Sequence, residues 1–119
     1  DRKPLFAEAL HVNSSFVTAV ANDYGFDNIY SRMVEAAGRK GDIFIGISTS
    51  GNSVNVVNAI EKANKIGMTT IGFTGQNGGK INDICDIIIK IPSIDTPRIQ
   101  ESHILVGHII CQLIEEELF

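Results

Sequence analysis

The stretch Asp42–Gly75, DIFIGISTSGNSVNVVNAIEKANKIGMTTIGFTG, reads as a strand, a polar turn, a helix and a second strand. Its first apolar run, Ile43–Ile47, is short and bounded by a glycine and the turn, which is typical of a strand buried on both faces. The helix is predicted over Ser53–Ile66, Gly67 ends it, and a strand follows over Thr69–Thr74. This alternation predicts parallel strands with right-handed crossovers, and therefore an α/β fold.

The turn between this strand and this helix is rich in hydroxyl groups. Four of its six residues carry one, namely Ser48, Thr49, Ser50 and Ser53. The first amides of a helix have no intrahelical partner, and the helix dipole is positive there. Ordinary helix capping explains one hydroxyl, whereas the whole set, with Gly51 allowing close backbone approach, indicates a phosphate site. The Gly-Lys-Ser/Thr ending of a P-loop and the GxGxxG fingerprint are both missing, so a small phosphorylated metabolite is favoured over a nucleotide.

The other elements are predicted from apolar periodicity and from turn residues. They are a strand over Leu5–Leu10, a helix from Asn13 or Ser14 to about Ala21, a turn over Asn22–Gly25, a helix over Phe26–Ala37, at most a short helix over Lys80–Cys85, a strand over Asp86–Ile91 and a long helix from Pro97 to about Glu117.

Composition restricts the class of protein. The 119 residues are 44% hydrophobic and 20% charged, as expected for one globular domain. A net charge of −4 without a basic run disfavours a nucleic-acid surface. No membrane-spanning stretch and no signal peptide is recognised, so we expect a cytoplasmic protein that does not enter a membrane. Cys85 and Cys111 stand in apolar sequence and are predicted to be buried free thiols.

Several segments together resemble one known family. GISTSGNS, followed by a helix and TTIGFTG, resembles the sugar-isomerase (SIS) domain. The similarity extends to the phosphoheptose isomerase family along nearly the whole chain, through ANDYGFDNIYSR (21–32), EAAGRKGD (35–42), the Gly-Gly-Lys at 78–80 and RIQESHILVGHIICQLIE (98–115).

The resemblance implies a known fold whose N-terminal segment is not in this sequence. We expect residues 1–119 to form one SIS domain, a three-layer α/β sandwich with a parallel, flavodoxin-like doubly wound sheet. The family begins earlier, with a helix, a first strand and a Gly-Asn-Gly-Gly-Ser turn whose helix carries a His and a Glu. That segment is not in this sequence, so we expect a domain incomplete at its N-terminus. Because that Glu is the family's principal base, we expect the 119 residues alone to be inactive.

The last helix is the second informative element. Gln100 and His108 lie eight residues apart, a little over two helical turns, and therefore within about one side-chain arc of each other. From the residues alone, His108 is as compatible with a core histidine as with a catalytic one. The resemblance implies that Gln100 and His108 line the active site and can ligate zinc. His103 is expected to be structural or interfacial.

The resemblance also assigns the substrate contacts. It implies that Asn22 and Asp23 contact a sugar, that the four hydroxyl residues of the turn bind its phosphate, and that Gln100 assists. The implied reaction converts sedoheptulose 7-phosphate into D-glycero-D-manno-heptose 7-phosphate through an enediol, an early step toward bacterial heptose. Such a reaction needs an acid/base and stabilisation of an oxyanion, which His108 and a zinc ion could provide. The resemblance implies a homotetramer with active sites completed across subunits.

Two alternatives stay open. One is a related SIS isomerase for another phosphosugar, such as an arabinose 5-phosphate or a hexose phosphate, against which Gln100 and His108 in their RIQE context argue. The other is a non-catalytic protein that binds a phosphosugar or associates with a replication initiator. In the second case the phosphate turn would persist while acid/base residues drift, and the presence of His108 argues against such drift.

Overall fold

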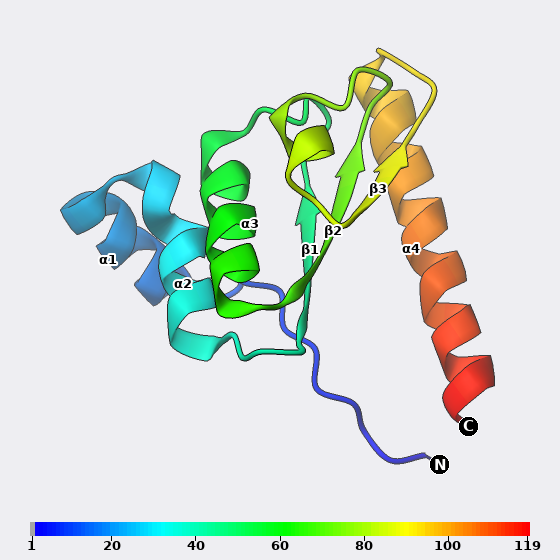
Figure 1. Ribbon diagram of the computed structural model, residues 1–119, viewed down its shortest axis with the longest axis horizontal. Helices are drawn as coiled ribbons and strands as arrows, with labels where there is room; N and C mark the ends of the chain where they lie inside the picture. The colour runs from blue at the N-terminus through cyan, green and yellow to red at the C-terminus, as the bar shows by residue number, and fades with distance from the viewer. Residues whose placement is uncertain (1) are drawn as a thin grey trace.

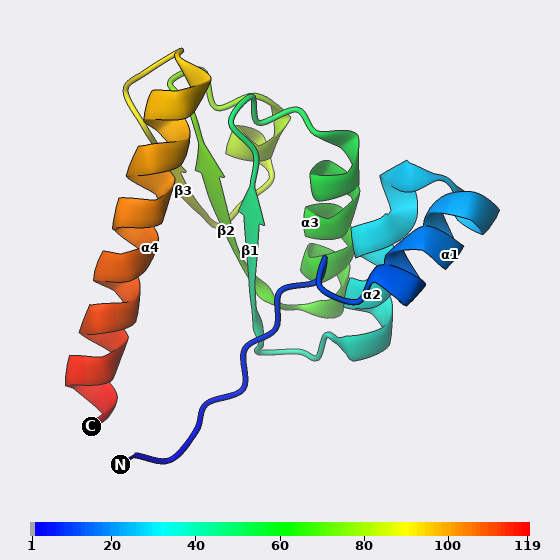
Figure 2. The ribbon, with the colours of Figure 1, turned by 180° about the vertical axis from the view of Figure 1, so that it is seen from behind.

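The computed structural model describes residues 2–119 as helices around a parallel sheet. Figure 1 shows the sheet between one group of helices and a single long helix, and Figure 2 shows the same arrangement from behind. The elements are α1 (Ser14–Tyr24), η1 (Phe26–Asn28), α2 (Ile29–Ala37), β1 (Ile43–Ile47), α3 (Val54–Ile66), β2 (Thr69–Thr74), η2 (Lys80–Asp83), β3 (Ile87–Lys90) and α4 (Thr96–Leu118).

The sheet has three parallel strands in the order β1-β2-β3. Ile45, Ile71 and Ile87 are neighbours across it, which fixes the register of all three strands. In Figures 1 and 2, helices α1, α2 and α3 lie on one side of the sheet and α4 on the other. The α/β class and the layered arrangement predicted from the sequence are therefore confirmed.

The side of the sheet that faces α3 is well packed. Ile60 of α3 and Ile81 of η2 are fully buried, and both belong to one apolar cluster with Val57. Gly46 lets α3 approach β1 closely, since a Cβ there would lie 2.9 Å from Ile60. A second cluster, of Val34, Ala59 and Ala63, joins α2 to α3. These contacts anchor α3, the helix that the hydroxyl-rich turn enters.

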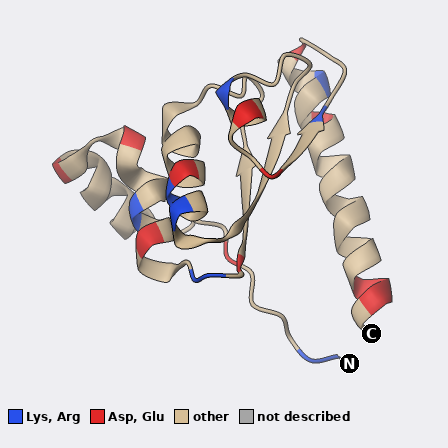
Figure 3. Cartoon of the chain, viewed as in Figure 1, with Lys and Arg blue, Asp and Glu red and all other residues tan. Residues whose placement is uncertain are grey.

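The side of the sheet that faces α4 is largely open. Successive residues of a strand point to opposite faces, and on β1 Ile43, Ile45 and Ile47 are 63%, 45% and 55% exposed. Only Ile99 and His103 of α4 are buried. Figure 3 shows acidic and basic residues scattered over the elements, whereas the middle of α4 carries none.

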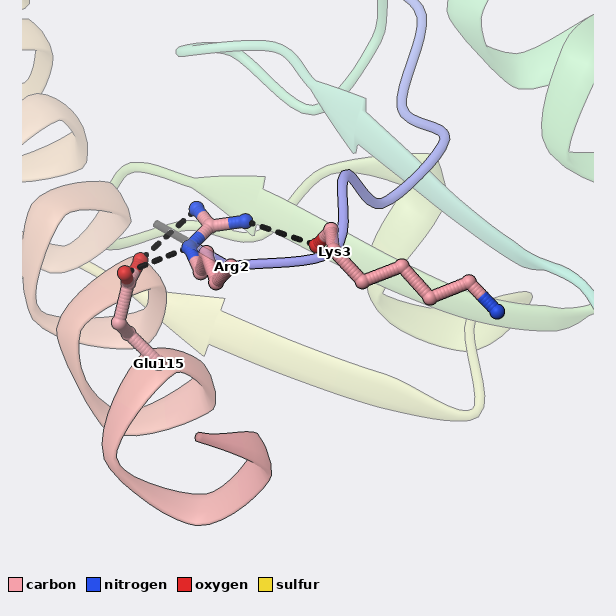
Figure 4. A network of polar contacts seen from close by, with 3 residues as sticks. All are labelled: Arg2, Lys3 and Glu115. Atoms are coloured by element: carbon pink, nitrogen blue, oxygen red, sulfur yellow. Dashed lines mark hydrogen bonds and ion pairs between the residues drawn. The ribbon is translucent and has the colours of Figure 1, made fainter.

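The two ends of the described chain meet beside α4. Figure 4 shows the Arg2 guanidinium against the Glu115 carboxylate, with Nε–Oε1 and Nη2–Oε2 distances of 2.6 and 2.9 Å. Arg2 also lies over the Phe119 ring, 4.9 Å from its centroid. The hydrogen bond from Arg2 lowers the pKa of Glu115 below its usual value, and the same bond raises the pKa of Arg2. Both side chains are exposed, so this contact adds little stability.

Several predictions need correction. Leu5–Leu10 forms no strand, because its backbone finds no neighbouring strand with which to pair. Asn22–Tyr24 belong to the last turn of α1, and only Gly25, with φ of 87°, leaves the helix. The helix predicted over Phe26–Ala37 begins as the 3₁₀ turn η1.

The cysteines are less buried than predicted. Both are free, but Cys85 is only partly buried and Cys111 is exposed. Burial, followed by the neighbouring Asp86 charge, raises the pKa of the Cys85 thiol. In residues 2–119, none of the helices combines the length and the apolar character needed to cross a membrane.

Candidate active site

The hydroxyl-rich turn connects the end of β1 to the start of α3. Ser48 is buried, and its Oγ lies 2.9 Å from Ser53 Oγ and 3.4 Å from Ser50 Oγ. Ser53 occupies the N-cap position of α3 but makes no side-chain capping bond. The hydroxyls are thus gathered beside the helix N-terminus, where the dipole favours an anion. The structure brings together three of the four residues that the sequence predicted for phosphate binding, and the fourth, Thr49, lines the cavity beside the turn.

Glycines hold this turn against the loop before η2. A Cβ on Gly51 would overlap the Gly78 carbonyl oxygen, and φ at Gly51 is +67°. The Ile81 amide donates to the Gly51 carbonyl at 3.1 Å. Asn52 adds a clamp, because its Oδ1 accepts from the Lys80 amide at 3.0 Å and its Nδ2 donates to the Ser50 carbonyl at 3.1 Å. These contacts hold the turn rigidly against the loop before η2.

A cavity of about 260 Å³ lies beside the turn, at the C-terminal ends of the strands. In open α/β sheets this edge is where ligands bind. Segments that follow all three strands contribute to its wall, together with the first turns of α4. The lining residues are Thr49, Ser50, Asn52, Gly75, Gln76, Asn77, Ser93, Ile94, Thr96 and Ile99.

The sequence reasoning assigned no role to Asn52, Gln76, Asn77, Ser93 or Thr96. Gln76 and Asn77 follow β2, and Ser93 and Thr96 lie between β3 and α4 or at its start. A usable signal existed, because polar residues directly after parallel strands meet at one edge of the sheet. The cavity wall is accordingly polar and, in the described part of the chain, holds no titratable side chain.

Gln100 and His108 lie on α4, and both are exposed. A helix rises about 1.5 Å per residue, so eight residues separate their Cα atoms by about 12 Å. Neither residue lines the cavity, although Ile99 next to Gln100 does. Within residues 2–119, His108 is not a core histidine. His103 is instead the buried histidine of this helix, 4% exposed, as its predicted structural role requires.

Asn22 and Asp23 are exposed at the end of α1, and the Asn22 side chain donates to the Asp23 carboxylate at 2.8 Å. Helix α1 packs on η1 and α2, on the side of the sheet away from α4. The structure thus does not bring these two residues to the cavity, and their sugar contact stays a prediction.

The described residues hold too few metal ligands for the predicted zinc site. Residues 2–119 contain no group of three or more His, Cys, Asp or Glu side chains placed to hold a metal ion. Gln100 and His108 offer two donors, whereas a zinc ion in a protein is usually bound by four ligands. The described residues of a single chain therefore do not fit a zinc site by themselves.

Comparison with known proteins defines the family. Residues 1–75 match the model of the SIS domain, and the chain belongs to the SIS domain family. The resemblance to the SIS domain predicted from the sequence is therefore confirmed, and the two relatives given next are phosphoheptose isomerases. The chain is 56% identical over 119 residues to the phosphoheptose isomerase of Clostridium acetobutylicum, covering 100% of the chain and 61% of that protein. It is 53% identical to phosphoheptose isomerase 2 of Campylobacter jejuni, covering 100% of the chain and 59% of that protein.

Solved structures agree with this assignment. A phosphoheptose isomerase from Francisella tularensis superposes with a TM-score of 0.94 and 39% identity, over 97% of this chain and 62% of that one. The enzyme from Neisseria gonorrhoeae gives 0.88 and 46%, over 90% and 61%. The chain thus spans about three fifths of the length of the relatives it matches.

Proposed function

We propose that the protein is an aldose–ketose isomerase that converts sedoheptulose 7-phosphate into D-glycero-D-manno-heptose 7-phosphate. The main support is the hydroxyl turn at the N-terminus of α3, opening on a polar cavity in a chain 56% identical to a phosphoheptose isomerase. Ser48, Ser50 and Ser53 offer hydroxyl donors to the phosphate, and the free amides at the start of α3 add to them. The polar wall of the cavity suits the hydroxyls of a sugar.

The chemistry requires groups that the cavity wall does not provide. Isomerisation through an enediol moves a proton between adjacent carbons, so it needs an acid/base within reach of both. No titratable residue lines the cavity in the described residues. His108 is a suitable proton carrier near neutral pH, and the Gln100 amide can orient a hydroxyl or stabilise a developing oxyanion. We propose these two roles for them, with the principal base contributed from outside residues 1–119.

Self-association is the second part of the proposal. His108 is exposed on a helix whose Ile104, Leu105 and Leu113 are 65%, 62% and 57% exposed. Exposed apolar surface of this extent favours burial against a partner. A second copy placed against α4 would bury these residues and could bring its own His108 to this cavity. A homotetramer, as expected from the family resemblance, is the assembly we propose.

We propose a zinc ion as cofactor only with additional ligands from outside the described residues. Gln100 and His108 supply two donors, so a complete site needs further ligands from elsewhere in the protein or from a second copy. When bound, zinc would polarise a carbonyl as a Lewis acid. The proposed roles of Gln100 and His108 as donor and proton carrier do not depend on it. We also propose a cytoplasmic location, which the two free cysteines support.

The test follows the reaction directly. The complete gene product is incubated with sedoheptulose 7-phosphate in deuterated water, with and without zinc, and NMR follows aldose formation and deuterium at carbon 2. We expect conversion, with a loss of about 100-fold or more in His108→Ala if it is the acid/base. His11→Ala is the matched control, because His11 is exposed on the N-terminal segment, away from the cavity.

The alternative is a non-catalytic phosphosugar-binding protein. It is favoured by one observation, the cavity wall without titratable residues beside an intact phosphate turn. Ser48→Ala would weaken binding of the sugar phosphate under either function. Binding without conversion or deuterium exchange, in the folded oligomer with zinc present, would favour the binding protein. Conversion of another phosphosugar alone would retain the isomerase and change its substrate.

A further inference from the structure

A buried histidine behind the cavity has no role in the function proposed above. His103 is 4% exposed, and its ring stands edge-on to that of Phe73, with 5.6 Å between the ring centroids. Its Nε2 lies 3.1 Å from the carbonyl oxygen of Thr74, while its Nδ1 is buried without a partner. A carbonyl oxygen can only accept, so Nε2 carries the hydrogen. A leucine would fill similar space without an unsatisfied polar atom, so the bond to Thr74 is the feature that a histidine adds.

The Thr74 carbonyl, which accepts this hydrogen bond, lies where several segments of the chain meet. Thr74 is the last residue of β2, and its carbonyl also accepts from the Ile91 amide at 2.9 Å. The next amide, of Gly75, donates to the Thr49 carbonyl in the phosphate turn at 2.9 Å. A Cβ on Gly75 would lie 2.6 Å from Ile99, 2.9 Å from the Thr49 carbonyl and 3.1 Å from the Ser93 carbonyl. The turn, the segment after β3 and α4 therefore meet at this point.

Helix α4 has few other ties to the body of the protein. Within residues 2–119, the bond from His103 to Thr74 is its only hydrogen bond to the sheet, because its other side-chain bonds stay within the helix or reach Arg2. Its buried residues are Ile99 and His103 alone. These two residues lie one turn apart on one face of the helix. They therefore fix the rotation of α4 about its axis and its position along that axis. Gln100 lies between them.

We propose that His103 is a positioning residue. It sets the rotation of α4 about its axis and its position along that axis, so that Gln100 lies at a fixed place relative to the phosphate turn. The inference rests on the proposed isomerase function. A phosphate held by the turn fixes one end of the sugar, and the reacting carbons lie at the other end. A small displacement of α4 then separates Gln100 from those carbons without disturbing the phosphate contacts.

The test uses three substitutions in the complete gene product. His103→Leu retains volume and removes the donor. His103→Gln restores an N–H donor at about the position of Nε2, whereas His103→Asn carries its amide one methylene short. We expect kcat to fall about 10- to 100-fold in the Leu and Asn variants, with inhibition by inorganic phosphate unchanged. We expect the Gln variant to recover to within about fivefold of the wild type.

Two results would overturn the inference. One is a folded His103→Leu protein with kcat near the wild-type value. The other is equal loss in the Gln and Asn variants, a comparison that still decides if the Leu variant does not fold. A wild-type protein without turnover contradicts the proposed function alone. The register of α4 is then read without ligand, from nuclear Overhauser contacts between Ile99 and Gly75, which should persist in the Gln variant and weaken in the Asn variant.

Discussion

The two faces of the sheet differ in how completely one chain covers them. Toward α3, Ile60, Ile81 and Ala59 are fully buried. Toward α4, Ile43 of β1 and Ile104 of α4 are 63% and 65% exposed. The exposed face is apolar in sequence too, since in β1, which reads IFIGI, it carries three isoleucines. The difference shows that an apolar pattern identifies a surface that is suited to burial, while the cover depends on which elements are present to provide it.

The largest expected effect compares one isoleucine from each side. Ile60→Ala leaves a cavity under α3 and should lower the free energy of unfolding by about 2–5 kcal/mol. Ile104→Ala, on the exposed part of α4, should change it by about 0.5 kcal/mol or less in dilute monomer. Urea unfolding followed by circular dichroism measures both. Equal losses at low protein concentration would contradict the comparison, and a loss for Ile104→Ala that grows with concentration would support self-association through α4.

A pair of glycines sharpens the comparison at the level of the backbone. Gly51→Ala forces a side chain into a left-handed conformation, at a cost of about 1–2 kcal/mol, and pushes against the Gly78 carbonyl. Binding of the sugar phosphate should weaken with it, because the phosphate turn must shift. Gly107→Ala has open space around its Cβ within α4, so it should be neutral or stabilise the helix by up to about 1 kcal/mol. Calorimetry measures stability and affinity in both variants, and unchanged affinity in Gly51→Ala would contradict the rigid turn.

The two cysteines report the same contrast chemically. Cys85 is partly buried on the α3 side and its pKa is raised, so less of it is thiolate at a given pH. Cys111 is exposed on α4. The thiolate is the reactive form, so a thiol reagent at pH 8 should modify Cys111 several times faster than Cys85. Mass spectrometry of the two peptides measures the rates. Protection of Cys111 in a concentrated sample would locate an interface on α4.

The smallest effect is expected at the ion pair between the chain ends. Arg2→Ala removes the partner of Glu115, and both groups are exposed, so the melting temperature near neutral pH should stay within experimental error. The pKa of Glu115 is lowered in the folded protein, so the contribution of the pair is present above the usual value of 4.5 and is lost as the pH falls below it. A pH series of melting curves for Arg2→Ala and wild type checks this, and a clear difference at neutral pH would contradict it.

The sequence predicted most of the fold because its central unit is local. The strand, helix and strand over Ile43–Thr74 were recognised within a residue of their bounds, since their periodicity and glycine punctuation agree. The strand over Leu5–Leu10 failed, because strand formation needs a neighbour that no local pattern reports. For the same reason the prediction that β1 is buried on both faces is wrong for the described residues, since Ile43, Ile45 and Ile47 are exposed.

The candidate site divides in the same way. The hydroxyl turn was found because its residues are consecutive, whereas Ser93 and Thr96 reach the cavity from another strand end. The two histidines of α4 could be told apart only once one buried position was known. His103 follows Ile99 by one turn and shares its buried face, while His108 is nine residues from Ile99, about half a turn round the helix. The sequence alone does not show which face of α4 is buried, because both histidines have apolar neighbours on every side.

The contiguity of β1, α3 and β2 has a consequence for how the chain reaches its structure. These three elements pair and pack with neighbours close in sequence, so little chain entropy is lost in bringing them together. Helix α4 follows them and depends on a surface they have already made, through Ile99 and His103. We therefore expect this unit to form first during refolding and α4 to dock last, so that amides of α3 gain protection from hydrogen exchange before those of α4. On a ribosome the same order would leave the phosphate turn assembled while the residues proposed to act on the sugar are still being added.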